Sequence, residues 1–152
     1  MQTVPRVLTE TRILVVVLQL GAALTGSAFL AMLMPVEWMA TTHRWLGLGE
    51  FPRVPITDYL TRSVAALYGF HGVLLFLISR DPVRHRVFVR YIGWMNVLFG
   101  ICLLLIDLHA GLPRWWILGE GPPVAILGAT VLYLSRNAGV TRDSGSRIPD
   151  PG

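Results

Sequence analysis

Apolar residues in this chain are grouped into long uninterrupted runs instead of alternating with polar residues. The clearest run extends from Ile13 to Met34 and contains no charged side chain over its 22 residues (13–34). An α-helix rises about 1.5 Å per residue, so a run of this length crosses the roughly 30 Å hydrocarbon layer of a bilayer. The pattern predicts a transmembrane helix over this segment.

Three further apolar segments follow the first. Arg62 and Arg80 bound the second, Arg90 and Asp107 bound the third, and Glu120-Gly-Pro-Pro interrupts the fourth. The second and third uncharged cores are slightly short, but flanking arginine side chains can extend toward lipid head groups and lengthen the apolar belt. The sequence predicts an all-α integral membrane bundle of four transmembrane helices, with spans at 13–34, 59–79, 88–108 and 115–135.

Composition supports this fold class. The chain has 152 residues, of which 53% are hydrophobic and only 14% charged, and its mean hydropathy is +0.57. A water-soluble core does not require so much apolar material. We therefore expect residues 1–136 to form a single four-helix transmembrane domain. The segment 137–152 is rich in Gly, Ser, Arg, Asp and Pro, and we expect it to be a disordered cytoplasmic tail.

The first apolar run also resembles a secretory signal peptide. Arg6 and Arg12 precede it, and small residues lie near Ala28 and Ala31. Its length of 22 residues (13–34) favours a retained membrane anchor over a cleaved peptide.

The distribution of basic residues predicts the topology. All thirteen are arginine, and most lie in short segments between apolar runs, a pattern of membrane topology instead of nucleic-acid binding. With the N-terminus inside, nine are cytoplasmic: Arg6, Arg12, Arg80, Arg84, Arg86, Arg90, Arg136, Arg142 and Arg147. Four lie outside: Arg44, Arg53, Arg62 and Arg114. The positive-inside rule then predicts a multi-pass protein with both termini cytoplasmic and with the lipid bilayer as partner.

Small residues recur at spacings typical of helix packing. They are Ala22 and Gly26, Ala65 and Gly69, Gly93 and Gly100, and Ala125 and Ala129. Such faces suit packing within one chain or between chains, so a homo-oligomer or a membrane partner subunit stays open.

Two features are expected around the first loop. The Trp and Pro residues of segment 35–57 favour an ordered segment at the outer membrane interface. Asp58 and Arg62, four residues apart at the start of the second span, predict a helix-capping carboxylate and a local ion pair.

Ionisable groups inside a membrane cost about 3 kcal/mol on insertion scales, so they are candidates for chemistry. In the third span, Asn96 and Asp107 share a helical face with Gly93 and Gly100, and this face should point into the bundle.

Asp107 and Glu120 should lie at comparable depths near the outer surface. Two such carboxyl groups would hold one proton between them, which suits proton transfer or capture of a cationic or hydroxylated ligand. Alternatively, each caps or hydrogen-bonds nearby backbone.

The sequence Glu120-Gly-Pro-Pro predicts a broken or restarted helix, because proline has no N–H for helical hydrogen bonding. Non-helical backbone at membrane depth is tolerated only against protein or a water-filled cavity. Glu120 then lines a pocket open to the outside, or the fourth helix starts at Pro122 with Glu120 at the interface. Both interpretations stay open.

Aromatic and histidine side chains extend the candidate ligand-binding set. Trp115 and Trp116 beside Arg114 are typical of an aromatic belt, with a pocket wall as the alternative. His71 and Tyr68 share a face in the middle of the second span, where a lone histidine is typically neutral and hydrogen-bonded.

No metal or other cofactor is expected. The four histidines lie at different depths, so they do not form a haem or metal ligand set. Cys102 is the only cysteine and lies within the third span, which excludes an intramolecular disulfide and a thiolate metal site. The usual catalytic motifs are also missing from the sequence.

The stretch 59–136 resembles small bacterial membrane proteins of the DoxX-like type. The likeness rests on Ala66-Leu-Tyr, Asp107-Leu-His-Ala-Gly-Leu-Pro, Trp115-Trp116 and Glu120-Gly-Pro-Pro, and covers about half of the chain. The resemblance implies a four-helix bundle in the bacterial inner (cytoplasmic) membrane; some DoxX relatives are associated with membrane oxidoreductase assemblies. It implies no catalytic residues.

These patterns favour a non-catalytic membrane protein that binds a small amphipathic molecule, or a partner subunit, through an outward-facing pocket. Its candidate residues are Tyr68, His71, Asn96, Asp107, Trp115, Trp116 and Glu120. One alternative is a membrane enzyme, isomerase-like, that uses two carboxyl groups as acid and base on a lipid-like substrate. Others are an accessory subunit of a membrane oxidoreductase and, last, a proton-coupled transporter.

Overall fold

The computed structural model describes residues 4–137 of this chain. Within this range the secondary structure is entirely helical: α1 (Val4–Gly26), α2 (Ala28–Met32), α3 (Val36–Trp45), α4 (Pro55–Ser79), α5 (Arg86–Ala110), α6 (Arg114–Gly119) and α7 (Gly121–Asn137). The expected disordered tail, 137–152, lies outside the described residues apart from Asn137, which ends α7.

Four helical segments are long and apolar enough to span a membrane. They are Leu8–Met32, Pro55–Ser79, Arg86–Ala110 and Arg114–Arg136. The prediction of an all-helical protein with four such segments is therefore confirmed. The second and third spans looked short because only their uncharged cores were counted. Their helices continue through the flanking polar residues to 25 residues each.

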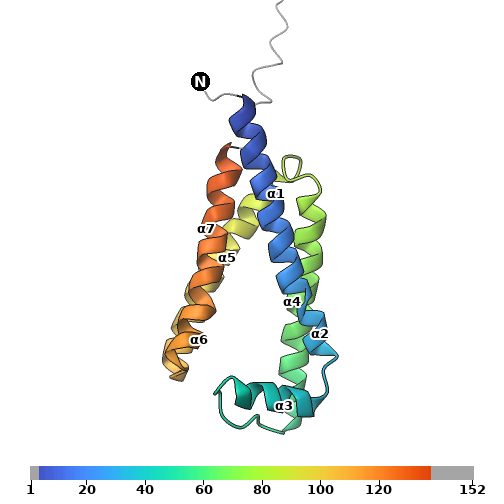
Figure 1. Ribbon diagram of the computed structural model, residues 1–152, viewed down its shortest axis with the longest axis vertical. Helices are drawn as coiled ribbons and strands as arrows, with labels where there is room; N and C mark the ends of the chain where they lie inside the picture. Colours follow the sequence, from blue (N-terminus) through green and yellow to red (C-terminus); the bar gives the residue numbers. More distant parts are fainter. Residues whose placement is uncertain (1–3, 138–152) are drawn as a thin grey trace, which may run out of the picture.

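The long helices are arranged as two pairs that diverge from a common end (Figure 1). Helix α1 packs mainly against α4, and α5 packs mainly against α7, while contact between the pairs is chiefly between α1 and α7. A single apolar core joins all four long helices at the common end; it includes Leu14, Leu18, Leu75, Val89 and Val131. We call this the closed end, and the other the open end.

Glycine allows the helices within each pair to approach closely. A Cβ atom at Gly100 of α5 would lie 2.5 Å from the backbone nitrogen of Ala125, and one at Gly121 of α7 would lie 2.7 Å from the Gly100 carbonyl oxygen. A Cβ atom at Gly72 of α4 would collide with the backbone of Gly26. The predicted packing role of Gly100 is confirmed, whereas at Gly26 the close approach needs the glycine of its partner, Gly72, and a Cβ atom at Gly26 itself would meet nothing within 4 Å.

One of the predicted small residues does not pack within the chain. Ala129 is exposed, and α7 presents Gly121, Ala125 and Gly128 to α5 instead. The expected Ala125–Ala129 spacing of four was replaced by the Gly121–Gly128 spacing of seven, which matches Gly93 and Gly100 on the antiparallel partner.

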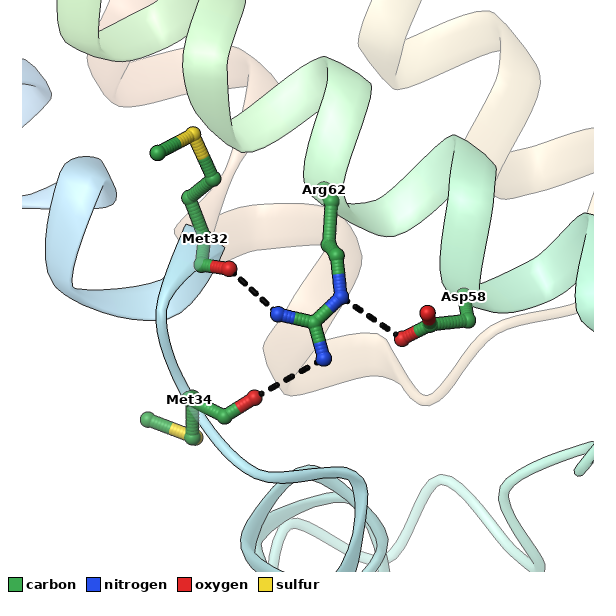
Figure 2. A network of polar contacts seen from close by, with 4 residues as sticks. All are labelled: Met32, Met34, Asp58 and Arg62. Atoms are coloured by element: carbon green, nitrogen blue, oxygen red, sulfur yellow. Dashed lines mark hydrogen bonds and ion pairs between the residues drawn. The ribbon is translucent and has the colours of Figure 1, made fainter.

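Polar contacts fix the open end of the α1–α4 pair. Arg62 of α4 is ion-paired with Asp58 at 2.9 Å, as predicted. Its guanidinium also donates hydrogen bonds to the carbonyl oxygens of Met32, at 2.5 Å, and Met34, at 3.2 Å (Figure 2). The last carbonyls of a helix lack intrahelical donors, so one planar guanidinium satisfies the end of α2 and the start of the next connection.

Helix α3 lies across the open end of α4 (Figure 1). It buries Met39 and Ala40 and exposes Trp38 and Trp45. An ordered segment between the first two spans is therefore confirmed. Its place at an outer membrane interface stays a prediction.

Candidate functional site

Asp107 lies in the last turn of α5, on the face that packs against α7. Gly93, Gly100 and Asp107 are spaced by seven residues, about two helical turns, so they share this face. Asp107 is buried, with 3% of its surface exposed, and its Oδ2 atom has no hydrogen-bond donor among residues 4–137. An unsatisfied buried polar group costs about 1–3 kcal/mol, so stability does not explain this carboxyl group.

The Asp107 side chain does not satisfy the end of its own helix. Gly111, in the left-handed conformation with φ 68°, ends α5, and its N–H donates to the backbone carbonyls of Asp107 and Leu108. The Leu112 N–H also donates to the Asp107 carbonyl at 3.2 Å. The backbone thus closes this helix end by itself, and the dipole there disfavours a carboxylate. A capping role, one alternative from the sequence, does not fit Asp107.

Glu120 lies at the break between α6 and α7. Helix α6 ends at Gly119, Glu120 has φ −103° and ψ −71°, and α7 starts at Gly121. The predicted interruption is confirmed. Pro122 and Pro123 have no N–H, so the carbonyls of Leu118 and Gly119 lack their usual helical donors four residues later.

Packing against α5 fixes the position of Glu120 along that helix. A Cβ atom at the neighbouring Gly121 would lie 2.7 Å from the Gly100 oxygen and 2.8 Å from the Leu104 nitrogen. Glu120 therefore lies within the apolar segment Arg114–Arg136. It is about one helical turn nearer the closed end than Asp107. The helix after the break starts at Gly121, one residue before the predicted Pro122, and the short helix α6 precedes it.

The two carboxyl groups are close enough to interact electrostatically. Trp116 donates its indole N–H to Glu120 Oε2 at 2.5 Å, which orients this carboxyl group. No arginine of the described segment is ion-paired with Asp107 or Glu120; the ion pairs there join Arg44 to Glu50 and Arg62 to Asp58. Among the described residues, neither acidic group is therefore neutralised by an ion pair.

Tyr68 belongs to the other helix pair but reaches the same site. Its ring centroid lies 6.2 Å from that of Phe99 on α5, and Tyr68 interacts electrostatically with Glu120. His71 lies about one turn away on α4 and is half-buried. It has no hydrogen bond or ion pair with any residue in the range 4–137, so the expected hydrogen-bonded histidine is not found and His71 is not joined to the site.

The two tryptophans of α6 have different surroundings. Their rings are in T-shaped contact, with centroids 5.4 Å apart. Trp116 is half-buried and bound to Glu120, whereas Trp115 is 50% exposed. Trp116 therefore forms part of the site, and Trp115 forms its outer edge.

Asn96 is a predicted site residue that lies away from the carboxyl pair. It is half-buried on α5, and its Cβ atom lies against Gly128 of α7. Eleven residues separate it from Asp107, which corresponds to about 16 Å along a helix. Asn96 shares the packing face but does not contact the carboxyl pair.

Metal-ligating side chains are not clustered in the part of the chain that the structure describes. No group of three or more His, Cys, Asp or Glu residues there is arranged to hold a metal ion. Cys102 is exposed on α5.

Comparisons with protein-family models, curated proteins and solved structures gave no match for this chain. The resemblance to DoxX-like proteins therefore stays a prediction.

Sequence reasoning missed three components of this site. Phe99 was not singled out, because its contact with Tyr68 joins two helix pairs. The freed carbonyls of Leu118 and Gly119 were not assigned to individual residues, although the two prolines carry that signal. The seven-residue spacing of glycines in both the third and the fourth apolar segment could have identified which face of each helix meets the other.

Proposed function

We propose that this protein binds a small amphipathic molecule within the membrane, at a site formed by Asp107, Glu120 and Trp116, with Tyr68 and Trp115 at its border. The observation that carries the proposal is the buried Asp107 carboxyl group, whose Oδ2 atom has no donor among the described residues. A ligand that supplies a hydrogen-bond donor would remove this cost.

The break in the fourth span supports the same proposal. Irregular backbone inside an apolar layer is tolerated where it faces protein or a cavity, so a break beside a buried carboxyl group marks a binding region. The aromatic rings of Trp116, Tyr68 and Phe99 supply apolar surface for the body of a ligand.

We also propose the orientation in the bacterial inner membrane that the sequence predicts. Exposed arginines gather at the closed end: Arg12, Arg80, Arg84, Arg86, Arg90 and Arg136. At the open end, Arg44 and Arg62 are paired with acidic residues. The positive-inside rule then favours cytoplasmic termini and an open end on the outer side. The inner-membrane assignment and an accessory role beside an oxidoreductase rest on the DoxX-like resemblance alone.

The test is native mass spectrometry of the protein extracted gently from its own membrane, which detects bound small molecules and partner subunits together. We expect a retained ligand in the unmodified protein and its loss in Asp107→Asn and in Glu120→Gln. The matched control is Glu37→Gln, which neutralises an exposed acidic residue on α3 and should retain the ligand. Undiminished ligand in both site variants, or a bare chain or a defined hetero-complex from the unmodified protein, would contradict the proposal.

A membrane acid–base enzyme is the second candidate, because the two carboxyl groups interact with each other and Glu120 also interacts with a tyrosine. The carboxamide variants separate the two functions. An enzyme would keep substrate binding and lose turnover, whereas a binding protein would lose binding itself.

A further inference from the structure

The open end of the α5–α7 pair has many hydrogen-bond acceptors and few donors. The acceptors are the carboxyl groups of Asp107 and Glu120 and the carbonyls of Leu118 and Gly119, which cannot receive helical hydrogen bonds from the two prolines. Of the two indole donors of α6, Trp116 Nε1 is already used by Glu120, and none of the described residues donates to Asp107 Oδ2. A ligand that brings its own hydrogen-bond donor would satisfy this atom.

The two carboxyl groups of the site are not neutralised by ion pairs among the described residues. Two acidic groups interact there, no arginine of the described range is ion-paired with them, and Asp107 lies at the negative end of the α5 dipole. The first turn of α7 does not favour an anion, because Pro122 and Pro123 remove two of the N–H groups that bind anions at helix starts. Electrostatics therefore favours a cation.

Aromatic rings complete the description. Trp116 holds Glu120, and Tyr68 and Phe99 are in ring contact nearby. Indole and phenol rings attract organic cations through their faces and cover apolar carbon. A bare metal ion would gain little from these rings, and no cluster of three ligating side chains occurs in residues 4–137.

We propose that the ligand is a primary or secondary ammonium ion carried on an apolar body. This inference rests on the proposed function and names the class of molecule that the site takes. The ammonium N–H groups donate to Asp107 Oδ2 and to Glu120, its charge balances the acidic pair, and its carbon chain lies against the aromatic rings. A quaternary ammonium has the charge but no N–H donor, and an alcohol has a donor but no charge.

Two sources share this chemistry: a free amphipathic amine and the ethanolamine head group of a lipid. They differ in whether the bilayer itself can supply the ligand. The lipid composition around the protein can therefore distinguish them.

The experiment is calorimetric titration of the full-length protein in phosphatidylcholine nanodiscs with four probes that share a six-carbon chain: hexylamine, hexyltrimethylammonium, 1-hexanol and hexanoate. Hexylamine should bind about tenfold or more tightly than each of the others. In Asp107→Asn this advantage should disappear, so that hexylamine and 1-hexanol bind alike. Glu37→Gln should preserve the ranking. Circular dichroism and gel filtration check each fold, and Glu120→Gln carries the test if Asp107→Asn does not fold.

Adding phosphatidylethanolamine to the nanodiscs separates the two sources. Competition with hexylamine assigns the site to the lipid head group, and undiminished hexylamine binding assigns it to a free amine; both results support the ammonium proposal.

Equal binding of hexylamine and 1-hexanol, reduced in Asp107→Asn, would overturn the ammonium proposal and leave the amphipathic-ligand function standing. Binding of none of the four probes, together with a bare chain in native mass spectrometry, would overturn both.

Discussion

At the closed end, four long helices share one apolar core, whereas at the open end the α1–α4 pair is held by the polar contacts of Arg62 and the α5–α7 pair by close glycine packing. Leu75 and Val89 at the closed end have 2% and 0% of their surface exposed. The open end instead contains the Arg62 hydrogen bonds, the broken fourth span and the unsatisfied Asp107. Stability and candidate chemistry are therefore separated along the length of the molecule, and substitutions at the two ends should have different effects.

The largest expected effect is at the closed end. Leu75→Ala removes a side chain that is 2% exposed within the shared core and should lower the free energy of unfolding by about 2–5 kcal/mol. Leu67→Ala, on the same helix but 70% exposed, should change it by less than about 0.5 kcal/mol. Unfolding of both variants in detergent measures the difference. Equal losses would remove the distinction between the ends.

A smaller effect is expected for the polar contacts of the open end. Arg62→Met removes the donors to Met32 and Met34 and the ion pair with Asp58, and should destabilise the protein by about 1–2 kcal/mol. The rate of backbone amide hydrogen exchange should rise in α2 and α3 and stay unchanged in α5 and α7. Arg53→Met, at an exposed position, is the control. Faster exchange throughout the molecule would mean that this arginine supports the whole fold.

The smallest effect should have the opposite sign. Asp107→Asn removes a charge from a buried position without a donor, so the stability of the ligand-free protein should stay the same or rise by up to about 1 kcal/mol. Asp58→Asn weakens an ion pair and should lower stability slightly. Thermal unfolding of the two variants side by side tests whether Asp107→Asn raises stability while Asp58→Asn lowers it. A loss of 2 kcal/mol or more (roughly the cost of breaking a buried polar network) in Asp107→Asn would give Asp107 a structural role.

The sequence predicts the parts of this structure that depend on local chemistry. Long uncharged runs define the four apolar helices, the two prolines after Glu120 define the break, and helical periodicity puts Asp107 on the face of Gly100. Each of these follows from residues within one helical segment.

The parts that need contacts between distant segments could not be predicted. The hydrogen bond from Arg62 to Met32 depends on how α2 lies on α4, and the ring contact of Tyr68 with Phe99 depends on how the two helix pairs join. Spacing alone also gave the wrong face of α7 at Ala129, because alanine and glycine repeats both satisfy a small-residue pattern and only the shape of the partner decides between them.

The divergence of the two helix pairs also gives the molecule a mechanical property. Helices α4 and α5 enter the shared core at Leu75 and Val89, so each acts as a lever with an arm about 30 Å long beyond that core (Figure 1). A rotation of about 5° at that pivot moves a far tip by about 3 Å, comparable to the length of one hydrogen bond. A rotation of one helix pair against the other would therefore change the separation of the two pairs most at the open end and least in the shared core.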